Sequence, residues 1–195
     1  MRDALRGRAF WTLTVIQFLT SIAMYSVNPQ IVAYLIDQGF TPLAAASAFG
    51  VAAVVGTAGV IGFAIVADRL GYLQSVTVSY VMSILGFGVL FLVALYPMLW
   101  VAYLFVFIYG PTFGSRGPVV NALTARVFGN RNLGSIMGFI QLGLGLGAAI
   151  GATLGGVIHD WLGGYEGVLA MASGCCGFGL LLYWITPEIR RAPRW

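Results

Sequence analysis

The sequence of 195 residues contains no lysine, a single histidine and two cysteines, and only 8% of its residues are charged. A soluble domain carries about 25% charged residues, so this composition excludes an ordinary water-soluble globular protein. Cys175 and Cys176 are adjacent within an apolar run, which argues against a disulfide framework or a cysteine-based metal site. We therefore expect no metal and no cofactor.

The residues that are abundant are apolar, at 59% of the chain. They form six stretches, each long enough to cross a bilayer, with only short connections between them. The sequence therefore predicts an all-α, polytopic membrane protein in which residues 1–195 form a single six-helix transmembrane domain. The third and sixth stretches carry few polar groups and are expected to be a lipid-facing scaffold. The six predicted spans are 10–35, 42–67, 75–95, 98–124, 134–158 and 165–185.

The arginines are distributed asymmetrically between the predicted loops. Nine of the ten lie before the first span, after the second, after the fourth or after the sixth, and the opposite loops hold Asp37, Asp160 and Glu166. The positive-inside rule then places both termini in the cytoplasm, in a multi-pass plasma (inner) membrane protein. The positive net charge thus reflects topology, and we expect no nucleic-acid partner. The nine arginines are Arg2, Arg6, Arg8, Arg69, Arg126, Arg131, Arg190, Arg191 and Arg194.

Two helix-end segments resemble each other. Residues 64–72 and 156–165 both contain two aliphatic residues, then an aspartate (Asp68 or Asp160), then Leu-Gly and a tyrosine. Three predicted spans separate them, so they lie on opposite sides of the membrane. An odd number of spans between equivalent points is what an inverted repeat requires. The sequence therefore predicts two inverted three-helix units, at about 10–95 and 98–186.

The fourth span holds an arginine, Arg116, between Pro111 and Pro118. It precedes Arg126 by ten residues, which is about 15 Å along a helix. An arginine at that depth costs at least about 2.5–3.5 kcal/mol, so it should face a cavity or a partner and not lipid. Tyr109 and Thr112 share its predicted face. Arg116 is the first functional candidate.

The first span carries a polar stripe at spacings of four, four and three: Gln17, Ser21, Tyr25 and Asn28. These spacings keep the four side chains on one helix face. Interhelical hydrogen bonding explains such a stripe, and so does the lining of a cavity, which we favour because four polar groups exceed what packing needs. Together with the Arg116 face, the stripe predicts a polar pocket with one fixed positive charge.

Small residues recur at every fourth position of the fifth span, at Gly143, Gly147, Gly151 and Gly155. Such a strip lets another helix backbone approach closely, and packing alone explains it. Gln141, beside the start of the strip, is read as packing or as pocket lining. The second span has a similar series, Ala52, Gly56, Gly59 and Gly62.

The chain resembles the C-terminal six helices of a major facilitator superfamily transporter. The segments that carry this resemblance are residues 64–71, Arg116-Gly-Pro with residues 125–129 after it, and residues 134–138. Within that superfamily the chain is similar to the monocarboxylate and oxalate–formate branch. The resemblance implies that Asp68, Arg69 and Gly71 form a gating loop. Here Ala64 replaces the usual glycine, and Tyr72-Leu-Gln74 replaces the basic tail of that motif.

The resemblance also implies transport of a small solute bound between two six-helix halves. The candidate substrate-binding residues are then Arg116, Tyr109, Thr112, Gln17, Tyr25, Asn28 and Gln141. Arg116 would hold an organic anion through its planar, bidentate donor groups. The expected partners are the lipid bilayer, a small-molecule substrate, and a separate N-terminal six-helix half or a second copy of this chain.

The sequence also allows two other classes of function. An intramembrane enzyme needs paired titratable groups or metal ligands, and the only adjacent pair, His159 and Asp160, lies at a helix boundary. We therefore expect no catalytic residues. A truncated or non-transporting membrane protein that needs a separate N-terminal half remains an alternative to the transporter.

Overall fold

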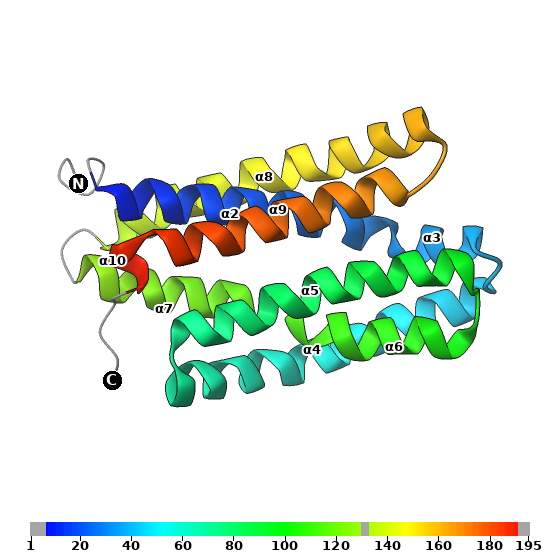
Figure 1. Ribbon diagram of the computed structural model, residues 1–195, viewed down its shortest axis with the longest axis horizontal. Coiled ribbons are helices and arrows are strands. Elements are labelled where there is room, and N and C mark those ends of the chain that lie inside the picture. Colours follow the sequence, from blue (N-terminus) through cyan, green and yellow to red (C-terminus); the bar gives the residue numbers. More distant parts are fainter. Residues whose placement is uncertain (1–6, 130–132, 191–195) are drawn as a thin grey trace.

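The computed structural model describes residues 7–129 and 133–190, and the described residues contain only helices and their connections. Figure 1 shows long helices running back and forth along one axis. In chain order the elements are α2 (Arg8–Val27), η1 (Asn28–Gln30), α3 (Ile31–Asp37), α4 (Pro42–Leu70), α5 (Tyr72–Leu95), α6 (Leu99–Tyr109), η2 (Gly110–Thr112), α7 (Arg116–Phe128), α8 (Leu133–Leu162), α9 (Glu166–Ile185) and α10 (Pro187–Arg190).

Five helical segments of the described residues are long and apolar enough to cross a membrane. They correspond to the predicted spans one, two, three, five and six, with ends that differ by a few residues: Arg8–Asp37, Pro42–Leu70, Tyr72–Leu95, Leu133–Leu162 and Glu166–Ile185.

The predicted fourth span is not one continuous helix. It consists of α6, with 11 residues, and α7, with 13, separated by the 3-10 turn η2 and by Phe113–Ser115. Pro111 removes a backbone donor at the break, and Gly114 adopts a φ of 73°, a conformation that side chains disfavour. Neither half is long enough to cross a bilayer alone.

The first span has a milder interruption, because the backbone there stays helical and Arg8–Asp37 still forms one membrane-crossing segment. The 3-10 turn η1 contains Pro29 and separates α2 from α3. Pro29 lacks the backbone donor that a continuous α-helix needs, which accounts for the 3-10 turn at this point.

The glycine strip of α8 packs directly against α2, as predicted. All four of its glycines are buried. A Cβ atom at Gly151 would lie 2.7 Å from the carbonyl oxygen of Ile22, and one at Gly155 would lie 2.6 Å from that of Ser26. These separations are too short for any side chain, so the two backbones approach closely because these positions are glycine. Gly145, by contrast, faces open space.

Helix packing does not follow the order of the chain. The helix α2 packs mainly against α8 and α9, whereas α6 packs against α4 and α5. Figure 1 shows the first group above the second. The first span thus packs with the last two, and the fourth packs with the second and third.

The expectation that the third span is a lipid-facing scaffold is wrong for one of its faces. Ser75, Ser79 and Ser83 of α5 are all buried, at a spacing of four residues, and point into the protein. The opposite face, with Val78, Val81 and Leu85, is exposed. The contacts of α5 depend on how its polar and apolar residues are divided between its two faces, and not on the low polar content of the whole span.

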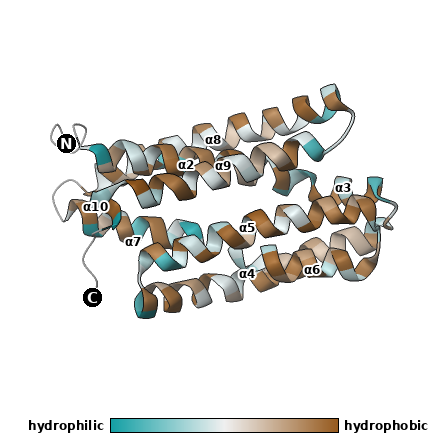
Figure 2. Ribbon diagram, in the orientation of Figure 1, coloured by the Kyte–Doolittle hydropathy of each residue, from teal (hydrophilic) through white to brown (hydrophobic). Residues whose placement is uncertain are grey.

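The two ends of the helix bundle differ in charge. The start of α2, the α4–α5 connection, the end of α7 and α10 lie at one end in Figure 1, and the α3–α4, α5–α6 and α8–α9 connections lie at the other. The described arginines other than Arg116 belong to the first end: Arg8, Arg69, Arg126 and Arg190. Figure 2 shows the long helices between the ends as predominantly hydrophobic.

Candidate functional site at two broken helices

The break in the fourth span is held in place by the small residues of α4. A Cβ atom at Gly59 would lie 2.5 Å from Pro111 Cα, and one at Gly56 would lie 3.2 Å from the Gly110 carbonyl oxygen. The break can therefore pack directly against the α4 backbone, because these two positions carry no side chain. Gly62, the last residue of the predicted strip, faces open space and takes no part in this contact.

Arg116 is the first residue of α7, and it is buried, with 6% of its surface exposed. Its Nε donates to Ser79 Oγ at 3.1 Å, and its Nη2 donates to the Ser79 carbonyl oxygen at 3.2 Å and to Ser83 Oγ. The guanidinium carbon also lies 4.3 Å from the centre of the Tyr80 ring. The side chain thus has protein partners and does not face lipid, as its depth in the span predicts.

All of these partners are neutral. Among residues 7–129 and 133–190 the only salt bridge joins His159 and Asp160, at the other end of the bundle. The positive charge of Arg116 is therefore buried, and no carboxylate of the described residues forms an ion pair with it. A buried charge without an opposite charge beside it is costly.

A series of hydrogen bonds connects Arg116 with the break in the first span. Ser83 Oγ, which accepts from Arg116, donates to Thr112 Oγ1 at 3.1 Å, and Thr112 donates to the Tyr109 carbonyl oxygen at 2.7 Å. The Tyr109 hydroxyl group then donates to Asn28 Oδ1 at 2.8 Å. The two proline-containing breaks are thus joined through Tyr109 and Asn28.

The structure brings together only some of the predicted substrate-binding residues. Arg116, Thr112, Tyr109 and Asn28 belong to the hydrogen-bonded series, and Gln17 is buried in α2. Two others lie on exposed surfaces: Tyr25 on α2, with 45% of its surface exposed, and Gln141 on α8. Ser21, the remaining member of the polar stripe, faces Gly147 of α8.

Sequence reasoning missed the residues that surround the guanidinium group. Ser79, Ser83 and Tyr80 all come from α5, which was expected to face lipid. The signal that could have found them is the Ser75–Ser79–Ser83 spacing, because residues four apart share one helix face.

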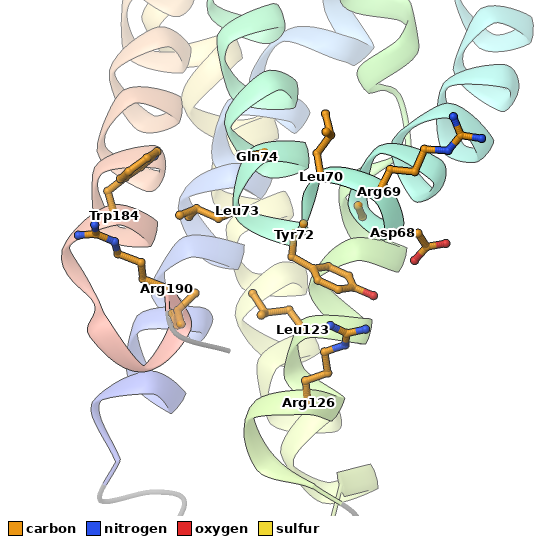
Figure 3. A pocket seen from close by; sticks show the side chains of 13 residues that line it. Asp68, Arg69, Leu70, Tyr72, Leu73, Gln74, Leu123, Arg126, Trp184 and Arg190 are labelled. Atoms are coloured by element: carbon orange, nitrogen blue, oxygen red, sulfur yellow. The ribbon is translucent and has the colours of Figure 1, made fainter. Parts of the chain in front are cut away.

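The predicted gating residues lie at the α4–α5 connection. Asp68 and Arg69 are exposed in the last turn of α4, and Gly71 joins the two helices with a φ of 102°. They line a cavity of about 380 Å³ together with the start of α5, the end of α7 and α10 (Figure 3).

The similar segment around Asp160 ends α8 in the same manner. Asp68 and Asp160 each precede the last residue of their helix by two positions, and the glycines that follow, Gly71 and Gly163, both have positive φ. His159 Nδ1 lies 3.3 Å from Asp160 Oδ1. The His159 ring also contacts the Tyr165 ring, with 4.3 Å between ring centres, and the pKa of Tyr165 is raised by burial and by the nearby Asp37 and Asp160 carboxylates.

Residues 79–194, more than half of the chain, match the sequence profile of the Major Facilitator Superfamily. The chain belongs to the major facilitator superfamily. No curated protein matches it. Membership in this superfamily agrees with the apolar helices and indicates a multi-pass membrane protein with a transport function. The matched residues include the break at Pro111, Arg116 and all three buried serine and tyrosine partners from α5.

Proposed function

We propose that this chain is one half of a secondary transporter for a small organic anion, such as a monocarboxylate, as in the monocarboxylate and oxalate–formate branch of the superfamily. In this proposal Arg116 binds the carboxylate of the solute. The observation that carries the proposal is the buried guanidinium group whose partners, among the described residues, are all neutral.

The surroundings of Arg116 suit exchange with a carboxylate. The Ser83 hydroxyl group is a neutral acceptor for Nη2, whereas a carboxylate in its place would bring the opposite charge and could accept two parallel N–H bonds from the guanidinium group. Arg116 also lies at the N-terminus of a half-helix, where the helix dipole favours negative charge. Both features favour an anion over a cation.

The two broken helices support a binding site at this level of the protein. In transporters with inverted repeats, interrupted helices in corresponding positions supply the substrate site near the bilayer midplane. Here η1 interrupts the first span and η2 the fourth, and Tyr109 and Asn28 connect them. In the proposal, movement of one broken helix relative to the other is coupled to solute binding through this bond.

An inverted repeat of residues 10–95 and 98–186 accounts for three features at once. The first helix of each unit is interrupted at a proline, and the second helix of each unit ends near an aspartate that a Leu-Gly pair follows. The first helix of each unit also packs against the last two helices of the other unit. We propose that a two-fold axis in the membrane plane relates the units. In this proposal the broken fourth span also crosses the membrane, so that the chain crosses it six times. The arginine-rich end then faces the cytoplasm, as the positive-inside rule requires.

The proposed partner is a second six-helix unit, either a separate N-terminal half or another copy of this chain. The segments α4 and α8 are the least buried of the five membrane-crossing helices, so they offer the largest apolar surfaces for such contact. Asp68, Arg69 and Gly71 would then lie at the cytoplasmic seam between the units and open or close it.

Uptake into liposomes tests this proposal. The chain is reconstituted alone, and with a six-helix N-terminal half, and uptake of labelled small monocarboxylates is measured with Arg116→Lys as the variant and Arg8→Lys as the matched control. We expect the wild type to take up the solute. Arg116→Lys should nearly abolish this uptake, because a lysine cannot replace the bidentate donor group, and Arg8→Lys should leave it unchanged. Absence of uptake in every combination would favour the non-transporting alternative.

A further inference from the structure

The cavity at the arginine-rich end has a composition that solute transport does not explain. Its lining includes three arginines, Arg69, Arg126 and Arg190, and one acidic residue, Asp68. Glu188 of α10 is exposed nearby but does not line the cavity. The lining therefore has a formal charge of +2.

Two of the arginines are held in place by aromatic rings. The Arg126 guanidinium carbon lies 4.3 Å from the Tyr72 ring centre, and that of Arg190 lies 5.8 Å from the Trp184 ring centre. Figure 3 shows these two pairs on either side of the start of α5, with Arg69 at the outer edge. The Trp184 indole nitrogen donates to Thr77 Oγ1 at 3.2 Å, which fixes this ring against α5.

The start of α5 itself adds donors to the cavity. Tyr72, Leu73 and Gln74 line it, and no side chain caps this helix. The first backbone N–H groups of a helix have no partner within the helix, and their dipole favours an anion. The three arginines and the first residues of α5 therefore line the same cavity.

The flanks of the cavity are apolar and exposed. Leu70, Trp184 and Ile185 have 57%, 45% and 63% of their surfaces exposed, and Val78 and Leu181 continue the apolar surface along α5 and α9. A soluble phosphate would leave these surfaces unused. A phospholipid would place its acyl chains along them and its headgroup in the cavity.

We propose that this cavity binds the phosphate headgroup of an anionic phospholipid, with Arg126 and Arg190 as its principal ligands and acyl chains along α5 and α9. Basic cavities between helices at the cytoplasmic surface are suited to such headgroups. Tyrosine and tryptophan favour the interfacial depth at which a headgroup lies. The site joins the α4–α5 connection to α7 and α10, so an occupied site would restrain the proposed gating residues.

Lipid binding to the purified chain in neutral detergent, without any solute, tests this inference independently of transport. Phosphatidylglycerol and phosphatidylcholine with identical acyl chains are compared by native mass spectrometry and by thermal melting. We expect phosphatidylglycerol to bind preferentially. Arg126→Gln and Arg190→Gln should each weaken its binding about fivefold, the equivalent of about 1 kcal/mol per basic residue.

Controls separate this site from general attraction to charge. Arg8→Gln, at the same end but outside the cavity, should leave binding unchanged, and Arg190→Lys should retain most of it. Equal binding of the two lipids, or equal losses with Arg8→Gln, would overturn the inference. So would stabilisation by glycerol 3-phosphate equal to that by phosphatidylglycerol, because the acyl chains would then contribute nothing.

Discussion

Arg116 of α7 donates a hydrogen bond to the side chain of Ser79 in α5, with 3.1 Å between Nε and Oγ, although the two residues are 37 positions apart in the sequence. A second bond from the same guanidinium group reaches the Ser79 carbonyl oxygen. The pair attaches the half-helix that follows the break to the most polar face of α5. Arg116 therefore connects the α5–α7 contact with the proposed anion site.

Removal of the serine hydroxyl groups should destabilise this contact. In Ser79→Ala and Ser83→Ala the buried guanidinium group loses an acceptor, and an unsatisfied buried group costs about 1–3 kcal/mol. We expect a lower melting temperature for each variant in detergent. Ser47→Ala, on the exposed face of α4, is the control and should melt like the wild type. Identical melting of all three variants would contradict the bonding described for Arg116.

The contact between α2 and α8 predicts a sharp difference between two glycines of α8. Gly151→Leu forces a side chain into the backbone of Ile22, at a cost of about 1–3 kcal/mol or more from overpacking. Gly145→Leu extends into open space. Measured by size-exclusion chromatography, the folded yield should fall for Gly151→Leu alone. Similar yields for the two variants would show that the strip does not support close packing.

The contact between the broken fourth span and α4 predicts a second difference between two glycine variants. Even Gly59→Ala places a Cβ atom against the Pro111 backbone, whereas Gly62→Ala meets nothing within 4 Å. We expect Gly59→Ala to shift the break, lower thermal stability and reduce uptake in the reconstituted transporter. Gly62→Ala should retain both, and a loss in the Gly62 variant comparable to that at Gly59 would refute this role.

The orientation in the membrane is testable with single cysteines. Cys175 and Cys176 are first replaced by alanine, and a cysteine is then introduced at Leu162, at the end of α8, or at position 130, outside the described residues. In intact cells a membrane-impermeant thiol reagent should label position 162 and should label position 130 only after permeabilisation. The reverse pattern would overturn the orientation inferred from the arginines.

Periodicity and composition predicted the structural features that are determined within a single helix. The apolar segments and the glycine strip at Gly143–Gly155 could both be identified, because each follows from residues close in sequence. The break at Gly110–Ser115 was underestimated. The sequence predicted one continuous span at 98–124, whereas Pro111 and Gly114 together end one helix and begin another.

Contacts between distant helices could not be predicted in the same way. The burial of Arg116 followed from its depth in the span, but its partners Ser79 and Ser83 depend on which face of α5 meets α7. The packing of α2 with α8 and of α6 with α4 depends on tertiary structure, which no local pattern encodes. In the proposed transporter, groups of the second six-helix unit also help to select the solute.

Ligand protection of Arg116 variants tests the central claim most directly. Melting curves of the chain, assembled with its six-helix partner, are recorded with increasing monocarboxylate for the wild type and for Arg116→Lys. A specific ligand at 100 times its Kd stabilises a protein by about 2.7 kcal/mol. The account predicts saturable stabilisation of the wild type and little or none of Arg116→Lys at the same concentrations. Equal stabilisation of the two proteins would contradict it and leave Arg116 with a purely structural role between α5 and α7.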